Sequence, residues 1–307
     1  MAVSDGAPAE AVGDAPGGRG IAWLDPVPPV ALVITAALSV QFGAAFGATI
    51  FDAVGPGGAS LLRQVFAAII LLAIWRPRLR RYTAADLRLA GSFGVALGLM
   101  NLFFYEALDR IPLGICVTIE FIGPVAVAVA FSRRALDLLW IALAVGGIVL
   151  LANPFGADGV DRTGLLFILA AAACWAVYIV LAQRATRIFD GSTGLALAAG
   201  VAWLMPLGPA LSETSPGDLL APSALAVGLA VAILSSVIPY SLESESLRRM
   251  PANVFGVLMS LEPAVAALAG FIVLGQHLSG RDVVAIALVI AASIGVTRTA
   301  APPVVDA

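Results

Sequence analysis

The sequence predicts an all-α membrane protein whose ten transmembrane helices form two inverted repeats of five helices. Three observations lead to this fold class. The chain of 307 residues is 60% hydrophobic and 12% charged, with a mean hydropathy of +0.99, whereas soluble proteins carry roughly 25% charged residues. Ten apolar runs follow one another along the chain. Finally, one segment occurs twice, at a spacing that inverts the second copy in the membrane.

The ten apolar runs match the length that crosses the hydrocarbon core of a bilayer, about 20 mostly apolar residues in a helix. Backbone N–H and C=O groups cannot stay unpaired in lipid, so we expect each run to be helical. Short links leave no room for a soluble domain between them. The expected helices are 28–50, 58–75, 87–108, 112–131, 136–152, 163–184, 192–211, 224–244, 253–273 and 282–298.

These helices divide the chain into four parts. We expect residues 1–26 to be a disordered N-terminal tail, because they are rich in Ala, Gly, Pro and Asp and contain no apolar core. The first five helices form one repeat over residues 27–153, and the last five form a second repeat over residues 160–298. A short C-terminal tail, residues 299–307, completes the chain.

The duplicated segment covers residues 105–131 and 244–270, which match at an offset of 139. This offset spans five helices, an odd number, so the two copies have opposite orientations. Inverted repeats usually enclose a binding site near the midplane of the membrane and rock to expose it to each side in turn. Seven of the 27 aligned positions are identical: Glu106/Glu245, Leu108/Leu247, Arg110/Arg249, Pro112/Pro251, Pro124/Pro263, Ala128/Ala267 and Ala130/Ala269.

The distribution of arginine predicts the orientation of the chain. All 17 residues counted as Lys or Arg are arginines. With the N-terminus in the cytoplasm, 13 of them fall on the cytoplasmic side, three on the outer side and one, Arg63, inside a helix. Cytoplasmic loops are normally enriched in basic residues. We therefore expect both termini to be cytoplasmic, in agreement with an even number of helices.

Four polar side chains are expected deep inside the helices. At 1.5 Å per residue, Arg63, Asn101 and Glu120 lie about 8, 10 and 12 Å from the outer ends of their helices, and so share one level of the membrane. Glu262 lies near the middle of the ninth helix. A charged residue at the bilayer centre costs roughly 2.5–3.5 kcal/mol on insertion scales, so such residues normally face a protein or water-filled interior.

Two interpretations of Arg63 and Glu120 stay open. Either they form a buried ion pair that locks two helices together, or Arg63 binds a substrate carboxylate while Glu120 binds an ammonium group or a proton. Glu262 is either a proton-coupling site or a packed, hydrogen-bonded carboxyl, and Asn101 either lines the site or bridges helices. Three more glutamates lie at helix ends, where we expect them to be interfacial: Glu106, Glu243 and Glu245.

Aromatic residues inside the helices form a second set of candidates. Trp175 and Tyr178 are three residues apart, which puts them on one face of the sixth helix. Tyr105 and Tyr240 lie within the third and eighth helices. These four rings either pack in the core or form a cavity wall.

Prolines inside the helices predict local breaks. Proline has no N–H and leaves a backbone carbonyl without its helical partner. Ser235, Ser236 and Pro239 therefore mark a weak point in the eighth helix, and Pro124 and Pro263 do the same just after the two central glutamates.

Missing motifs disfavour several functional classes. The sequence contains no GxxxxGK[ST] loop of an ATPase, no HExxH metal motif and no GxSxG nucleophile elbow. Cys116 and Cys174 lie inside apolar runs and offer neither a disulfide framework nor metal-ligand spacing. We expect no cofactor, no metal and no nucleic-acid partner. A membrane-embedded enzyme or a sensor is the alternative from another class.

Short motifs are spread over the whole helical part of the chain. The sequence reads NLFFY at 101–105, EFIGP at 120–124, CWAVY at 174–178, PYSLE at 239–243 and LMSLEP at 258–263. This combination resembles the threonine/homoserine exporters of the EamA branch of the drug/metabolite transporter superfamily, over nearly all of residues 28–298. One departure is Gln276, because related proteins often carry glutamate at this position.

The resemblance implies the EamA fold in the bacterial inner (plasma) membrane and proton-coupled export of small amino acids, such as threonine and homoserine, by alternating access. The alternative is a broader metabolite, drug or aromatic amino-acid exporter of the same superfamily. The implied partners are the amino acid, protons and the lipid bilayer, and a homodimer stays open. The candidate substrate-binding residues are Arg63, Asn101, Tyr105, Glu120, Trp175, Tyr178 and Tyr240, and the proton-coupling candidates are Glu262 and Glu120.

Overall fold

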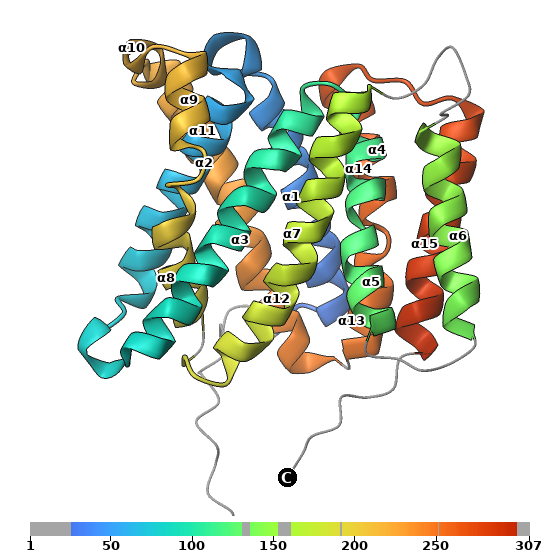
Figure 1. Cartoon of the computed structure of the whole chain (residues 1–307), viewed down its shortest axis with the longest axis horizontal. Coiled ribbons are helices and arrows are strands. Elements are labelled where there is room, and N and C mark those ends of the chain that lie inside the picture. Colours follow the sequence, from blue (N-terminus) through green and yellow to red (C-terminus); the bar gives the residue numbers. More distant parts are fainter. Residues whose placement is uncertain (1–25, 131–135, 153–160, 191, 251, 300–307) are drawn as a thin grey trace, which may run out of the picture.

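The computed structural model describes residues 26–130, 136–152, 161–190, 192–250 and 252–299, which are almost entirely helical (Figure 1). Apart from one residue each, the two predicted tails, 1–26 and 299–307, lie outside the described residues. The first half of the chain contains α1 (Pro29–Ala48), α2 (Phe51–Trp75), α3 (Ala84–Leu108), α4 (Leu113–Glu120), α5 (Ile122–Ala130) and α6 (Leu136–Ala152).

The second half begins with α7, and several of its helices are interrupted. In chain order they are α7 (Arg162–Thr186), α8 (Thr193–Ala202), α9 (Leu207–Glu213), α10 (Pro216–Leu219), α11 (Pro222–Ala232), a π-helix (Ile233–Val237), α12 (Ile238–Arg249), α13 (Ala252–Met259), α14 (Glu262–Leu274) and α15 (Gly280–Thr299). Each of the ten runs predicted from the sequence coincides with one or more of these helices.

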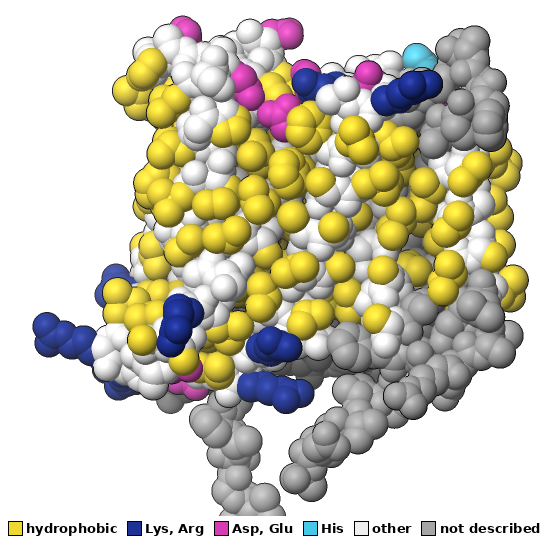
Figure 2. All heavy atoms as spheres, viewed as in Figure 1, with side chains coloured by type: hydrophobic (Ala, Val, Ile, Leu, Met, Phe, Trp, Pro, Cys, Tyr) yellow, Lys and Arg dark blue, Asp and Glu magenta, His cyan; other side chains and the backbone are white. Residues whose placement is uncertain are grey.

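The helices are those of a multi-pass membrane protein. Six helical segments in the described residues are long and apolar enough to cross a membrane, and three shorter apolar helices, 113–127, 139–150 and 262–274, accompany them. On the face shown in Figure 2, hydrophobic side chains cover the flank of the molecule, while charged side chains gather at its two ends. This distribution suits a body whose middle faces lipid and whose ends face water.

Prolines coincide with the breaks in the helices, as the sequence predicts. Pro124 lies in the first turn of α5, Pro239 in the first turn of α12 and Pro263 in the first turn of α14. Proline fits the first turn of a helix because the N–H that it lacks has no helical partner there. The weak point expected around Ser235 is confirmed, since the chain forms a π-helix at 233–237.

Helices from the two halves exchange neighbours. The first helix, α1, packs against α12 and α14 of the second half. Correspondingly α7, the first helix of the second half, packs against α3 and α5 of the first half. The last helices of the two halves, α6 and α15, lie side by side (Figure 1). The core is therefore shared between both halves.

Glycines allow two helices of this core to approach closely. A Cβ atom on Gly94 or Gly98 of α3 would collide with the carbonyl oxygens of Ala198 and Ala202 in α8. Such close approach through small residues is a common way for membrane helices to associate. It fixes α3, and with it Asn101, against the second half of the chain.

Candidate functional site

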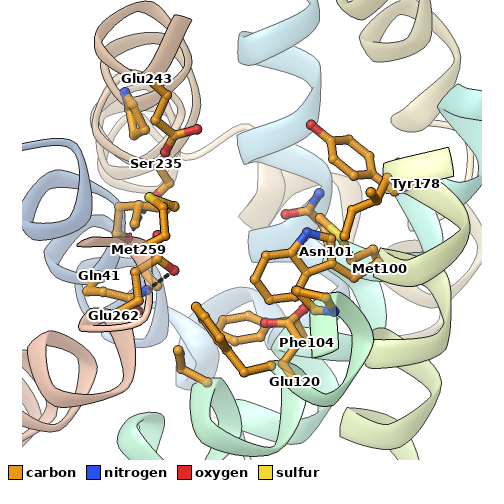
Figure 3. Close-up of a pocket in the computed structure, with 18 of the residues that line it drawn as sticks. Gln41, Met100, Asn101, Phe104, Glu120, Tyr178, Ser235, Glu243, Met259 and Glu262 are labelled. Carbon is orange, nitrogen blue, oxygen red and sulfur yellow. Dashed lines mark hydrogen bonds between the residues drawn. The ribbon is translucent and has the colours of Figure 1, made fainter. Parts of the chain in front are cut away.

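A cavity of about 370 Å³ lies between the two halves of the chain. Its size is in the range of small-molecule binding sites, roughly 300–1,000 Å³. Helices from both halves contribute to its wall (Figure 3). The polar and aromatic side chains that line it are Gln41, Arg63, Asn101, Phe104, Glu120, Phe121, Trp175, Tyr178, Ser235, Tyr240, Glu243, Phe255, Glu262 and Ser293.

Most of the predicted site residues meet in this cavity. Six of the seven substrate-binding candidates line it, together with Glu262. The exception is Tyr105, which is fully buried. Its ring packs 5.6 Å from the Phe51 ring, between centroids, and lies 5.7 Å from the guanidinium carbon of Arg63. Tyr105 thus supports Arg63 from behind and does not form part of the cavity wall.

Arg63 of α2 is held by the π-helix between α11 and α12. Its Nη2 donates a hydrogen bond to the Ser235 carbonyl oxygen at 3.0 Å, and its Nε donates to Ser236 Oγ at 3.4 Å. In a regular α-helix the Ser235 carbonyl would accept from the residue four positions later, which is Pro239 and has no N–H. The proline therefore frees the carbonyl that anchors Arg63.

Glu120 and Arg63 line the same cavity but form no ion pair among the described residues. Glu120 also has no hydrogen-bond partner among the residues that the structure describes. Glu120 is the last residue of α4 and lines the cavity. The helix-locking ion pair considered from the sequence is therefore absent from this part of the chain. The carboxyl group is free to bind a ligand.

Glu262 has a partner on the first helix. It is the first residue of α14, and Gln41 Nε2 of α1 donates a hydrogen bond to its Oε2 at 3.3 Å (Figure 3). Figure 3 shows Glu262 and Glu243 on one side of the cavity and Asn101 and Tyr178 on the other. The site thus contains three glutamates, Glu120 from the first half and Glu243 and Glu262 from the second, and among the described residues only Glu262 has a hydrogen-bond partner.

Asn101 lines the cavity without bridging helices. Its Nδ2 donates to the Leu97 carbonyl oxygen of its own helix at 2.8 Å. The aromatic wall is fixed by ring contacts: the Trp175 ring meets the Phe121 ring edge-on at 5.2 Å, and the Tyr178 ring lies 5.1 Å from the Phe93 ring. Trp175 and Tyr178 therefore combine packing with a place in the wall.

Glu243 corrects one interpretation made from the sequence. It lines the cavity and is not interfacial. The signal was present, because Glu243 follows Tyr240 by three residues and shares its helix face. Glu106 and Glu245 instead lie near Arg110 and Arg249, at 3.6 and 3.7 Å, in ion pairs one helical turn apart. Gln41 was also missed, since a lone glutamine in an apolar run carries no pattern.

The cavity is suited to a zwitterion. Arginine binds carboxylates through two parallel hydrogen bonds, and the carboxyl group of Glu120 complements an ammonium group. Aromatic and apolar side chains fill the rest of the wall. Among the described residues, no cluster of His, Cys, Asp or Glu is arranged to hold a metal ion.

A helical body of this kind, with a charged cavity between two halves, is typical of a membrane transporter. Comparison with known proteins agrees: residues 162–298 match the EamA-like transporter family. The chain is 43% identical over 284 residues to the threonine/homoserine exporter RhtA of Salmonella typhimurium (strain SL1344), which covers 90% of this chain and 92% of that protein. The chain therefore belongs to the EamA family of transporters and is not an enzyme.

Other relatives extend the comparison. The threonine/homoserine exporter RhtA of Escherichia coli (strain K12) is 42% identical over 283 residues, covering 90% of this chain and 92% of that protein. The uncharacterized transporter YwfM of Bacillus subtilis (strain 168) is 25% identical over 226 residues, or 73% of this chain and 69% of that protein. A solved structure titled "Crystal structure of protein" superimposes with a TM-score of 0.59 at 21% identity, over 89% of this chain and 97% of that one, and so shares the fold.

Proposed function

We propose that this chain exports small amino acids such as threonine and homoserine across the bacterial inner membrane by proton-coupled alternating access. The observation that carries the proposal is the similarity over 90% of the chain to exporters named for these amino acids. The cavity supports it, because it offers an arginine and a carboxyl group that are not paired with each other.

In this proposal Arg63 binds the carboxylate of the amino acid and Glu120 binds its ammonium group. Arg63 is already oriented by Ser235 and Ser236, so little side-chain freedom is lost when the substrate arrives. The small side chain of the substrate then packs against Phe104 and Trp175. The cavity wall thus matches both charges and the apolar part of the substrate.

Glu262 is the proposed proton carrier, with Glu120 as the second candidate. Burial disfavours the charged form of a carboxyl group, whereas contact with water favours it. A carboxyl that alternates between the two environments therefore takes up and releases a proton. Gln41 suits this role because its amide offers both a donor and an acceptor to the Glu262 carboxyl group.

The proposed architecture has ten membrane crossings in two inverted repeats, residues 27–153 and 160–298. The packing of the helices supports two repeats. The first helix of the first half, α1, packs against α12 and α14 of the second half, and the first helix of the second half, α7, packs against α3 and α5 of the first half. Positive side chains predominate at the lower end in Figure 2 and acidic ones at the upper end. The first helix begins and α15 ends at the lower end (Figure 1), which supports cytoplasmic termini.

Counterflow in proteoliposomes tests the proposed substrate. Vesicles loaded with unlabelled threonine are placed in trace labelled threonine, and uptake is compared with that of vesicles without protein. We expect threonine and homoserine to support uptake and phenylalanine not to. Uptake supported by phenylalanine or by unrelated metabolites would favour the broader exporter, which the aromatic side chains Trp175, Tyr178 and Tyr240 also suit. Uptake with none of these solutes would contradict both.

A further inference from the structure

A second and much smaller cavity lies beside the main one. Its volume is about 20 Å³, and helices α2, α3, α8 and α12 enclose it together with the π-helix. Half of its wall is polar or aromatic: Arg63, Gln64, Asn101, Ser236 and Tyr240. Three of these side chains, Arg63, Asn101 and Tyr240, also line the main cavity. These three shared side chains therefore form the boundary between the small cavity and the main cavity.

Gln64 lines this small cavity and carries a polar atom without a partner among the described residues. The residue is 5% exposed, and its Nε2 donates a hydrogen bond to Ser60 Oγ at 3.0 Å. Its Oε1 is buried and has no partner among the residues that the structure describes. Exchanging the two ends of the amide would leave the nitrogen unpaired instead. Buried polar groups are nearly always paired, with protein or with water, and the described side chains do not supply a partner for Gln64 Oε1.

The size of the small cavity defines the ligand. By the same measure, one water molecule needs roughly 10–15 Å³ and two to four polar partners. The cavity of about 20 Å³ therefore has room for one water molecule and is too small for an amino acid. Arg63 supplies a second polar partner, because it lines the same cavity and its Nε and Nη2 are fixed by the π-helix.

We propose that the small cavity binds one water molecule that bridges Gln64 Oε1 and the Arg63 guanidinium group, and that Gln64 is thereby a positioning residue for Arg63. The π-helix binds the guanidinium group directly, and the water connects the same group to Gln64 of α2. The transport consequence rests on the proposed function, in which Arg63 binds the substrate carboxylate. The water site itself does not depend on it.

A high-resolution structure of the protein without amino acid tests the water directly. We expect a single density peak within hydrogen-bond distance of Gln64 Oε1 in the wild type and none in Gln64→Met, which is of similar length and has no acceptor oxygen. A cavity that is empty in the wild type, at a resolution where other buried waters are visible, overturns the proposal. A peak that appears only with threonine also overturns it, because it identifies a substrate hydroxyl group.

Kinetics test the positioning role. We expect Gln64→Met to raise the half-saturating threonine concentration in counterflow about 2- to 10-fold, the effect of one hydrogen bond, with the maximal rate unchanged. Ser60→Ala is the matched control, because it removes the other partner of the Gln64 amide and leaves the water site intact. Equal half-saturation in Gln64→Met and Ser60→Ala, or a change in maximal rate alone, overturns the positioning role. If the wild type transports no threonine, the proposed function fails, and the density peak still decides the water site.

Discussion

Arg63 takes its position from a proline on another helix. Pro239 frees the Ser235 carbonyl, which then accepts from the Arg63 guanidinium group at 3.0 Å. The sequence predicts the free carbonyl, because proline lacks an N–H. It does not predict the donor, because Arg63 and Ser235 are 172 residues apart and only the packing of α2 against the π-helix brings them together.

Restoring the N–H at position 239 should therefore disturb Arg63. We expect Pro239→Ala to regularise the helix and draw the Ser235 carbonyl back into it. Hydrogen bonds to charged groups contribute about 1.5–3 kcal/mol, so the half-saturating threonine concentration should rise at least about tenfold. Counterflow measures this, with Pro222→Ala as a control, because Pro222 is exposed in the first turn of α11 and is not among the residues that line the cavity. Unchanged threonine affinity in Pro239→Ala would show that the freed carbonyl has no part in binding.

A substitution of Glu262 should abolish proton coupling and leave substrate binding intact. Glutamine keeps the size of glutamate and one oxygen that can accept from Gln41, but it cannot exchange a proton. We expect Glu262→Gln to retain threonine counterflow, which needs no net proton movement, and to lose export driven by an imposed pH gradient. Both rates are measured in the same proteoliposomes. Gradient-driven export at the wild-type rate would remove Glu262 from the coupling mechanism and leave Glu120 as the candidate.

At the scale of the helices, the apolar runs of the sequence were a sufficient guide. All ten correspond to helical segments, because lipid requires paired backbone groups. The breaks at Pro124, Pro239 and Pro263 were also predictable. The cavity-facing position of Glu243 was missed because its place near the end of an apolar run suggested an interface. The sequence left open whether Tyr105 packs or lines the cavity, because a polar aromatic ring in a helix gives the same pattern in both cases.

The contact between α3 and α8 provides a prediction at this scale. We expect Gly98→Ala to destabilise the protein by more than about 1 kcal/mol, since its methyl group would overlap the Ala202 carbonyl oxygen. Gly91→Ala on the same helix is the matched control. Its methyl group would meet no atom within 4 Å, and removing a helical glycine stabilises by about 0.5–1 kcal/mol. Thermal melting in detergent distinguishes them, and equal melting temperatures would contradict the packing described for α3.

At the scale of the molecule, the prediction of an inverted repeat rests on a stretch of only 27 residues. Seven identities and an odd number of intervening helices suffice to predict inversion. They do not show that α1 packs with the second half and α7 with the first. That exchange depends on surface complementarity between helices whose sequences no longer resemble each other.

The proposed orientation can be tested by labelling single cysteines in a variant without Cys116 and Cys174. A membrane-impermeant thiol reagent added to whole cells should modify Ser215→Cys and should not modify Leu79→Cys until the membrane is opened. Both residues lie at exposed ends of helices, so lack of access alone would not explain a difference. Labelling of Leu79→Cys from outside would reverse the orientation and the assignment of the arginine-rich side to the cytoplasm.

The central claim is that Arg63 and Glu120 bind the two charges of one amino acid. Competition in threonine counterflow tests it most directly, with threonine amide, which lacks the carboxylate, and N-acetylthreonine, which lacks the ammonium group. In the wild type, each analogue should compete at least about tenfold less well than threonine, the loss of one charge-assisted hydrogen bond. In Glu120→Gln, the discrimination against N-acetylthreonine should shrink while that against threonine amide persists. Analogues that compete as well as threonine in the wild type, or discrimination unchanged in Glu120→Gln, would contradict the claim.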